Sequence, residues 1–366
     1  MGSDRPPVLA AIIVLLVTAF LRLASPAQDL QKSSPEFSTS GCSATDSSDI
    51  VVAVEVTDKS GRPLTGLEAS DFRLFDNNQP QKILAICAVD TEHPPAVPLD
   101  VRIIIDAVNS GPVWVAQERD GLSAFLKQNS GKLDHPTSIW ILKNDGLNRI
   151  APPSRDGVSL LAALQGAQPQ LRIINRSAGV WGDVERTGQA IKLLKEMVSP
   201  ESRTPGRKLV LFLSPGWPML FNYEADQRSW IFNDIATISN GLRESCISLY
   251  TLDPSSSGAN LQPSGSGGSS STYESFLKGV RKIGDAQYPN LSLQVLSEHS
   301  GGQVIIGGNE IKAEIDSALR GASPWYNLVF ERAPGGRATE YHAIRVTVDK
   351  PRARIRTTAG YYVKGP

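Results

Sequence analysis

Hydrophobic and polar residues alternate with a period of two between residues 49 and 90. The period is clearest where valines alternate with small or polar residues, namely Val52, Val54 and Val56 against Ala53, Glu55 and Thr57. This alternation is typical of a half-buried strand. Asp71–Phe75 and Lys82–Val89 predict two further strands. Three strands are too few for a stable sandwich, so we expect residues 49–92 to pair with strands from elsewhere in the chain.

The C-terminal part of the chain shows the same period. Trp325–Glu331 places Tyr326, Leu328 and Phe330 on one face. Further strands are predicted at 343–348, 352–357 and 360–363. We therefore predict one small β-sandwich that is built from residues 49–92 and 323–364, with another domain inserted between its two halves.

The inserted region, residues 97–320, alternates strand and helix patterns. Asp100–Asp106 contains a continuous apolar run, as expected of a parallel strand buried on both faces. Further strands are predicted at 138–142, 208–213, 246–252 and 303–306, and helices at 114–129, 157–164, 184–197, 228–244, 291–299 and 311–319. Helices between buried parallel strands predict a doubly wound, mostly parallel α/β sheet with helices on both faces. Residues 254–271 are rich in Ser and Gly and are interpreted as a surface insertion.

The N-terminus predicts export. Arg5 precedes an apolar run of 14 residues, Val8–Leu21, which is shorter than the roughly 20 residues that span a bilayer. Ser25 and Ala27 suit a signal peptidase site, so we expect residues 1–27 to be a signal peptide, with a retained anchor as the alternative. Residues 28–48 are Ser-rich and are expected to form a flexible leader. The predicted location is periplasmic or extracellular.

Composition excludes some partners and cofactors. The 37 basic and 37 acidic residues balance, so nothing global favours nucleic acid, or a membrane beyond the export signal. Four basic residues alternate near the C-terminus and predict either a solvated strand face or a binding patch: Lys350, Arg352, Arg354 and Arg356. The three cysteines, Cys42, Cys87 and Cys246, suggest no disulfide framework, and the four histidines lie too far apart for a zinc motif.

The α/β region predicts a binding edge, because ligands of doubly wound sheets bind at the carboxyl ends of the strands. The first loop at that edge reads DAVNS from Asp106 to Ser110. A hydrophobic strand that ends in Asp before such a loop and a helix resembles the start of a von Willebrand factor A domain. In that family Asp-x-Ser-x-Ser, with a Thr and an Asp from two later loops, holds a divalent ion, usually Mg²⁺. Such an ion prefers about six hard oxygen ligands.

The chain departs from this family pattern in each of the three loops. Val108 replaces the first serine and has no oxygen to offer. Glu185 takes the place of the threonine, Thr187 is displaced by two residues, and Pro215 takes the place of the later aspartate.

Asp106 and Ser110 therefore remain as the candidate metal ligands. We expect no cofactor and a surface that works without metal, with weak Mg²⁺ binding as the alternative. Asp106 could equally cap the helix that follows it.

A second resemblance covers residues 50–364. It is carried by VEVTDKSG (Val54–Gly61), Gly66-Leu67, Asp71-Phe72 and the closing GYY (Gly360–Tyr362). Together with the A-like domain, these runs are similar to the VWFA-related acidobacterial family of predicted secreted proteins. The resemblance implies an exported A domain flanked by β-structure. It implies no activity, because that family is largely uncharacterised.

Aromatic residues lie in or beside the strand-to-helix connections: Trp114, Trp181, Trp217, Phe221 and Tyr223. Aromatic side chains are favoured at protein interfaces. We predict a partner-binding surface with the candidate residues Asn109, Trp114, Trp181, Glu185, Thr187, Ser214 and Trp217. Ordinary packing of long loops is the alternative interpretation.

No enzyme signature stands out. Ser214 lies in LSPGW, which is not the Gly-x-Ser-x-Gly turn of a nucleophilic serine. We therefore predict a non-enzymatic module for adhesion, scaffolding or assembly that binds another protein. One alternative is an envelope enzyme subunit, which requires Asp106, Asp183, Glu185 and Asp253 to cluster in one cleft with shifted pKa values. The other is a periplasmic ligand-binding protein, favoured by a deep pocket between the two domains.

Overall fold

Long apolar runs form the central sheet of the protein, as a computed structural model shows. The structure describes residues 1–2, 48–90, 93–95, 97–167, 179–219, 227–255, 260–261, 271–307, 310–332 and 337–364. Residues 1–34 and 35–366 form separate units, and the description below concerns the second. The predicted signal peptide, almost all of the leader and most of the Ser/Gly-rich segment lie outside the described residues.

The central sheet has six strands. In sheet order they are β12 (Gln303–Ile306), β9 (Ile247–Asp253), β8 (Lys208–Leu213), β5 (Asp100–Asp106), β6 (Lys132–Lys143) and β7 (Gly146–Asp156). All neighbours are parallel except β6 and β7. Counted from β5, the order is 3-2-1-4-5-6, the arrangement of a doubly wound fold. The predicted α/β class is confirmed.

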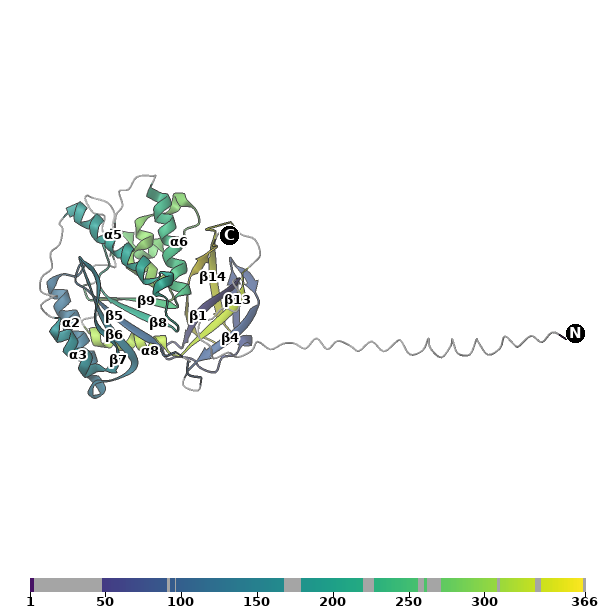
Figure 1. Cartoon of the computed structure of the whole chain (residues 1–366), viewed down its shortest axis with the longest axis horizontal. Coiled ribbons are helices and arrows are strands. Elements are labelled where there is room, and N and C mark those ends of the chain that lie inside the picture. The colour runs from purple at the N-terminus through teal and green to yellow at the C-terminus, as the bar shows by residue number, and fades with distance from the viewer. Residues whose placement is uncertain are drawn as a thin grey trace. The chain divides into compact units, whose positions relative to one another are not determined.

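Helices cover both faces of this sheet (Figure 1). One face packs on α2 (Pro112–Lys127), α3 (Gly157–Gly166) and α8 (Ile311–Ala322). The other packs on α5 (Gly179–Met197), α6 (Arg228–Glu244) and α7 (Leu293–His299). Short 3₁₀ turns complete this part, at Gln128–Gly131, Pro200–Ser202, Tyr273–Phe276, Ile283–Asp285 and Tyr288–Leu291, and a further turn, Ala69–Asp71, lies outside it. Two short strands, β10 (Asn260–Leu261) and β11 (Ser271–Thr272), pair with each other.

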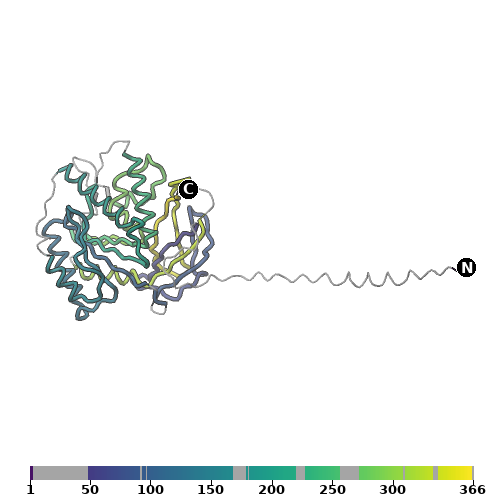
Figure 2. The backbone as a smooth tube through the Cα atoms, viewed as in Figure 1, coloured from purple at the N-terminus to yellow at the C-terminus, as the bar shows by residue number. Residues whose placement is uncertain are grey.

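The two ends of the folded unit form the predicted sandwich. One sheet has the order β15 (Arg354–Thr357), β1 (Asp49–Thr57), β13 (Trp325–Glu331) and β4 (Ile83–Val89). The other has the order β16 (Gly360–Tyr362), β14 (Tyr341–Val348), β2 (Phe72–Asp76) and β3 (Gln79–Gln81). Figure 2 shows purple-blue and yellow segments, from near the two ends of the colour scale, lying together in these sheets. Their shared apolar core includes Val52, Val54, Leu328 and Phe330.

Strand β1 is buried on both faces at its end, so the prediction of a half-buried strand is wrong there. Glu55 is only 2% exposed. Its carboxylate forms an ion pair with Arg207, just before β8, and accepts hydrogen bonds from Arg356 Nη2 (2.9 Å) and the Tyr250 hydroxyl (3.2 Å to Oε2). The strand therefore contacts the α/β domain with the face that the sequence pattern assigned to solvent.

The basic residues near the C-terminus do not form one patch. Arg356 points to the buried Glu55, and Lys350 pairs with Asp71 at 2.9 Å. Arg352 lies before β15 with a φ of 65°, which breaks the expected alternation. The prediction of a solvated strand face or a binding patch is therefore wrong for Arg356, because its guanidinium forms an ion pair with the buried Glu55.

A second contact joins the sandwich to α6. The side chain of Asn240 exchanges hydrogen bonds with the backbone of Tyr362, at 2.8 and 2.9 Å. The Tyr362 hydroxyl donates to the carbonyl of Val280 at 3.1 Å. Tyr341 and Tyr362 belong to the same apolar cluster as α5 and α6. The junction between the two domains is thus packed with side chains.

The sequence patterns missed β7. Its sequence contains two consecutive prolines and few apolar residues, and an edge strand tolerates proline because one side needs no hydrogen-bond partner. Among the described residues, neither Cys87 nor Cys246 forms a disulfide; Cys42 lies outside them. Cys246 precedes β9 with a φ of 52°, so it is not part of that strand. No helix in the described part is both long and apolar enough to cross a bilayer.

Candidate functional site

Asp106 ends β5 and organises the buried carboxyl edge of the sheet. Its Oδ1 accepts hydrogen bonds from the backbone N–H groups of Val108 (3.0 Å) and Asn109 (2.9 Å). Its Oδ2 accepts from the Asn109 amide (2.9 Å) and from the Ser214 hydroxyl (2.7 Å). Burial raises the pKa of Asp106, and these hydrogen bonds oppose that rise. Protein donors thus surround both carboxylate oxygens.

Ser110 points to a buried glutamate on α2. Its hydroxyl donates to Oε1 of Glu118 at 2.9 Å. Burial raises the pKa of Glu118 well above its usual value, and the nearby Asp106 and Asp253 carboxylates add to the rise. Oε2 of Glu118 is buried without a hydrogen-bond partner in the described part of the chain. A protonated Glu118 is the form that this environment favours.

The loop after β5 does not fit the Mg²⁺ site of the family pattern. Val108 packs in the apolar core, Ser110 faces Glu118, and Asp106 is held by protein donors. Within the described residues, no three His, Cys, Asp or Glu side chains are placed to hold a metal ion. These contacts speak against the predicted ligand role of Asp106 and Ser110, because a cation would have to displace the donors around Asp106.

Two glutamates that sequence reasoning missed lie behind this edge. Glu118 is fully buried on α2, and Glu314 on α8 is 7% exposed, with both carboxylate oxygens lacking a hydrogen-bond partner in the described residues. Burial and the charge of Asp253 raise the pKa of Glu314 to about 7. Both positions fall on the apolar stripe of their helices, next to Val115 and Ile315. The sequence signal that could have found both glutamates is an acidic residue within the apolar stripe of an amphipathic helix.

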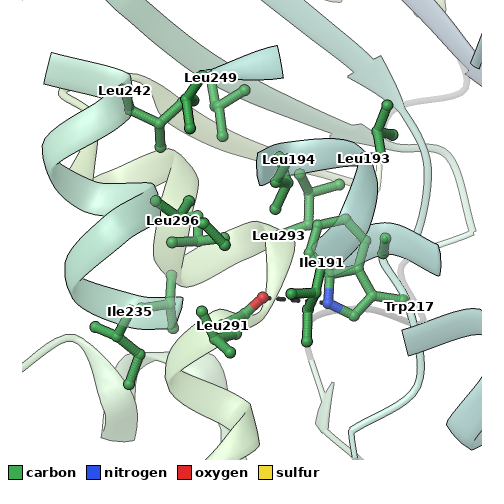
Figure 3. Close-up of a cluster of buried hydrophobic side chains, with 14 of the residues drawn as sticks. Ile191, Leu193, Leu194, Trp217, Ile235, Leu242, Leu249, Leu291, Leu293 and Leu296 are labelled. Atoms are coloured by element: carbon green, nitrogen blue, oxygen red, sulfur yellow. Dashed lines mark hydrogen bonds between the residues drawn. The ribbon is translucent and has the colours of Figure 1, made fainter. Parts of the chain in front are cut away.

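Three of the predicted partner-binding residues are buried, so the prediction is wrong for them. Thr187 donates its hydroxyl to the carbonyl of Pro218 at 2.7 Å, and Ser214 is committed to Asp106. Trp217 lies among leucines and isoleucines, and its indole N–H donates to the carbonyl of Leu291 at 3.1 Å (Figure 3). Packing of the loops against the protein interior, the alternative interpretation from the sequence, accounts for the burial of these three side chains.

The other predicted partner-binding residues differ in exposure. Trp181, near the start of α5, is 85% exposed, and Glu185 is exposed one turn later. Trp114 is half-buried, and Asn109 uses its amide to hold Asp106. Phe221 and Tyr223 lie outside the described residues. Of the predicted surface, Trp181 and Glu185 are the parts that face solvent most openly.

Several further apolar side chains are exposed at the carboxyl edge of the sheet. Trp230, in the first turn of α6, is 70% exposed, and Val113, in the first turn of α2, is 73% exposed. Val184 on α5 is 42% and Ile306, the last residue of β12, is 36% exposed. The parallel strands end at this edge, and the helices that connect them begin there. These side chains therefore gather on one side of the domain. Sequence reasoning missed Trp230, although it lies near the start of a helix as Trp114 and Trp181 do.

A groove of about 660 Å³ runs between α5 and α6 below this edge. Val184, Ile191, Trp230 and Tyr288 give it apolar walls. Its charges are largely balanced: Lys195 bridges to Asp234 on α6 at 2.7 Å, and Lys192 lies 3.8 Å from Glu196. The groove therefore offers apolar contact area without a dominant charge.

Comparison with known proteins gives structural matches only. No family model and no curated protein sequence matches the chain. In structure the chain is similar to a von Willebrand factor type A protein from Catenulispora acidiphila, with 11% identity and a TM-score of 0.32, covering 87% of this chain and 75% of the other. The chain is similar to von Willebrand factor A proteins.

Two further matches have titles that name a metal or an adhesin. Manganese-loaded TRAP protein of Plasmodium vivax is 10% identical, with a TM-score of 0.30, and the match covers 81% of this chain and all of the other. The pilus adhesin SpaC of Lactobacillus rhamnosus GG is 9% identical, with a TM-score of 0.34. That match covers 87% of this chain and 49% of SpaC, so the chain spans about half of SpaC. Because these TM-scores are low, the fold is assigned from the strand order of this chain and not from the matches.

Proposed function

We propose that the chain is an exported von Willebrand factor A-like protein-interaction module, which binds another protein at the carboxyl edge of its α/β sheet. The observation that supports this most is the exposure of Trp181 and Trp230 at the starts of two neighbouring helices, 85% and 70% respectively. Exposure of a large apolar side chain such as tryptophan to water is unfavourable in free energy. Tryptophans often supply much of the binding free energy at protein interfaces. Neither nucleic acid nor a membrane surface is part of this proposal, since the overall charge is balanced.

The partner contact is tested by capture from envelope extracts with the immobilised mature protein. We expect a partner that is recovered by the wild type and lost by the double variant Trp181→Ser, Trp230→Ser. The matched control is Val158→Ser, because Val158 is 62% exposed but lies on α3, which starts at the opposite edge. A partner that the double variant retains would contradict the proposed face.

Metal independence is the second part of the proposal. It is supported by the donors that surround Asp106 and by the missing oxygen at Val108. Calorimetric titration with Mg²⁺ and Mn²⁺ should give no saturable heat, and partner capture should survive a chelator. Micromolar binding that disappears in Asp106→Ala would overturn this part.

Export is supported by the apolar run Val8–Leu21 and the small residues Ser25 and Ala27. We expect N-terminal sequencing of the protein from a secreting host to begin near Gln28. A product that starts at Met1 and stays in the cytoplasm would contradict export, whereas a membrane-bound product that starts there would indicate a retained anchor.

The raised pKa values of Asp106, Glu118 and Glu314 are a feature that the enzyme alternative calls for, but these side chains are buried rather than exposed in a cleft. A periplasmic ligand-binding protein needs a deep pocket between domains, but Glu55, Arg207, Asn240 and Tyr362 fill the junction. An enzyme was expected to bring Asp106, Asp183, Glu185 and Asp253 into one cleft. Asp106 and Asp253 are instead fully buried, Asp183 pairs with Arg186, and Glu185 is exposed. We therefore keep a non-enzymatic module as the proposal.

A further inference from the structure

The outer edge of β7 is open in the described part of the chain. This strand pairs with β6 on one side, and it is the last strand of the six-stranded sheet. Its first six residues, Gly146–Ala151, contain no proline, whereas Pro152 and Pro153 follow. The open edge of a strand presents backbone N–H and C=O groups that a further strand can pair with. Residues 146–151 therefore form the part of the edge that could accept such a strand.

A groove of about 370 Å³ lies between α5 and the sheet face formed by β5, β6 and β7, so β7 forms one of its sides. Leu147, Leu193 and Met197 provide apolar walls. Trp140 lines it as well, and its indole N–H donates to the Ser138 hydroxyl at 2.9 Å, which fixes the orientation of the ring. The groove thus offers an oriented aromatic surface beside an open strand.

The four charged residues that line this groove balance, but one of its two arginines is available to an acidic ligand. Arg149 is exposed on β7, with its guanidinium 5.5 Å from the Trp140 ring, and no carboxylate pairs with it among the described residues. The other cation, Arg102, is already held by Asp100 at 2.8 Å. Glu196 lines the wall formed by α5, is 63% exposed, and lies 3.8 Å from Lys192. Arg149 therefore remains as the cation that can pair with an incoming carboxylate.

We propose that β7 binds an extended peptide segment of another protein, which adds as a further strand of the sheet. Leu147 and Arg149 are two residues apart and both line the groove, as expected for side chains on one face of a strand. The matching peptide carries an apolar residue and, two positions away, an Asp or Glu. Its backbone pairs with β7, its apolar side chain contacts Leu147 and Trp140, and its carboxylate pairs with Arg149. Strand addition with side-chain pockets is an established mode of peptide recognition.

This site begins at the carboxyl end of β6 but uses other residues than Trp181 and Trp230, so the two proposals can fail separately. A library of random heptapeptides displayed on phage is selected on the folded full chain. We expect the enriched peptides to share an apolar residue and an acid two positions apart. Synthetic versions should bind at least about tenfold more weakly to Arg149→Glu, as loss of a charge-assisted pair and added repulsion predict.

The matched control is Arg345→Glu. Arg345 is also an exposed arginine that stacks on an aromatic ring across a strand pair, 3.8 Å from Phe75, but it lies in the sandwich. Peptides should bind this variant and the Trp181→Ser, Trp230→Ser variant like the wild type. The neutral Arg149→Gln should show a smaller loss than Arg149→Glu, with unchanged circular dichroism in both.

Backbone pairing is tested with the same peptides after N-methylation of alternate amides. Because a methylated amide cannot donate a hydrogen bond, one of the two alternate methylation patterns should abolish binding. Selection without an acidic consensus, binding that ignores Arg149, or full tolerance of both methylation patterns would each overturn the proposal.

Discussion

At the scale of single residues, the acids at the carboxyl edge of the sheet are unusual because they are buried near one another. Asp106 is stabilised by donors on both oxygens, whereas Glu118 and Glu314 retain carboxylate oxygens without partners in the described residues. An unpaired buried carboxylate is costly when ionised, so the neutral form is favoured. We infer that these glutamates make the protein more stable in mild acid than at alkaline pH.

Glu314 allows this inference to be tested. Its folded-state pKa is raised from 4.5 to about 7 by burial and Asp253. Below about pH 4.5 both the folded and the unfolded chain carry the proton; as pH rises to 7 the unfolded chain loses it first. Stability should therefore fall between these values, and Glu314→Gln should remove the loss, gaining on the order of 1 kcal/mol at pH 8. Urea denaturation at several pH values measures this, with the exposed Glu196→Gln as a control that keeps the wild-type slope. A wild-type slope in Glu314→Gln would contradict it.

At the scale of elements, close helix packing supports the edge that carries the acids. Gly121 on α2 lies against Ile311, the first residue of α8, and an added Cβ would come within 2.4 Å of the Ile311 Cβ. The two helices can therefore approach each other only with glycine at this position. Gly188 on α5 has no atom within 4 Å of such a Cβ, so the same replacement has room there.

These two glycines predict opposite effects of one substitution. Gly121→Ala should destabilise the protein by about 1–3 kcal/mol, because overpacking outweighs the better helix propensity of alanine. Gly188→Ala should stabilise it by about 0.5–1 kcal/mol, because only the propensity changes. Denaturant unfolding of both variants provides the comparison. Equal effects of the same sign would show that the α2–α8 contact does not limit the packing.

At the scale of the whole folded unit, one buried network joins the two domains. Glu55 from the sandwich meets Arg207 before β8, Tyr250 on β9 and Arg356 on β15. Arg207 also donates to the carbonyl of Ala322 at 2.7 Å, at the end of α8. The two domains should therefore unfold together, since neither can separate without leaving buried charges unpaired.

Removal of the central carboxylate tests this coupling. Glu55→Gln should cost about 3–5 kcal/mol, because Arg207 would be left buried without its counter-charge. Asp349→Asn is the control: its partner Arg73 lies at 3.6 Å and both side chains are exposed, so the change should stay below about 0.5 kcal/mol. Calorimetry should show one transition in the wild type. Two separate transitions, or a Glu55→Gln effect as small as the control, would contradict the coupling.

The alternation of apolar residues at both ends of the chain, together with the apolar runs and helix patterns between them, predicted the sandwich, the inserted α/β domain and most of their elements. Local periodicity is a direct consequence of which face a strand or helix buries, and these elements bury continuous apolar faces. This reasoning missed the edge strand β7, because only one of its residues is buried and its two prolines resemble a loop.

The candidate site was only partly accessible from the sequence, because it depends on contacts between distant segments. The missing oxygens at Val108 and Pro215 can be read directly from the chain. That Ser214 would donate to Asp106, that Trp217 would be buried under Leu291, and that Glu55 would meet Arg207 depends on pairs separated by more than seventy residues. Local patterns determine which face of an element is apolar, but only the packing of those elements decides which polar group is buried against which partner.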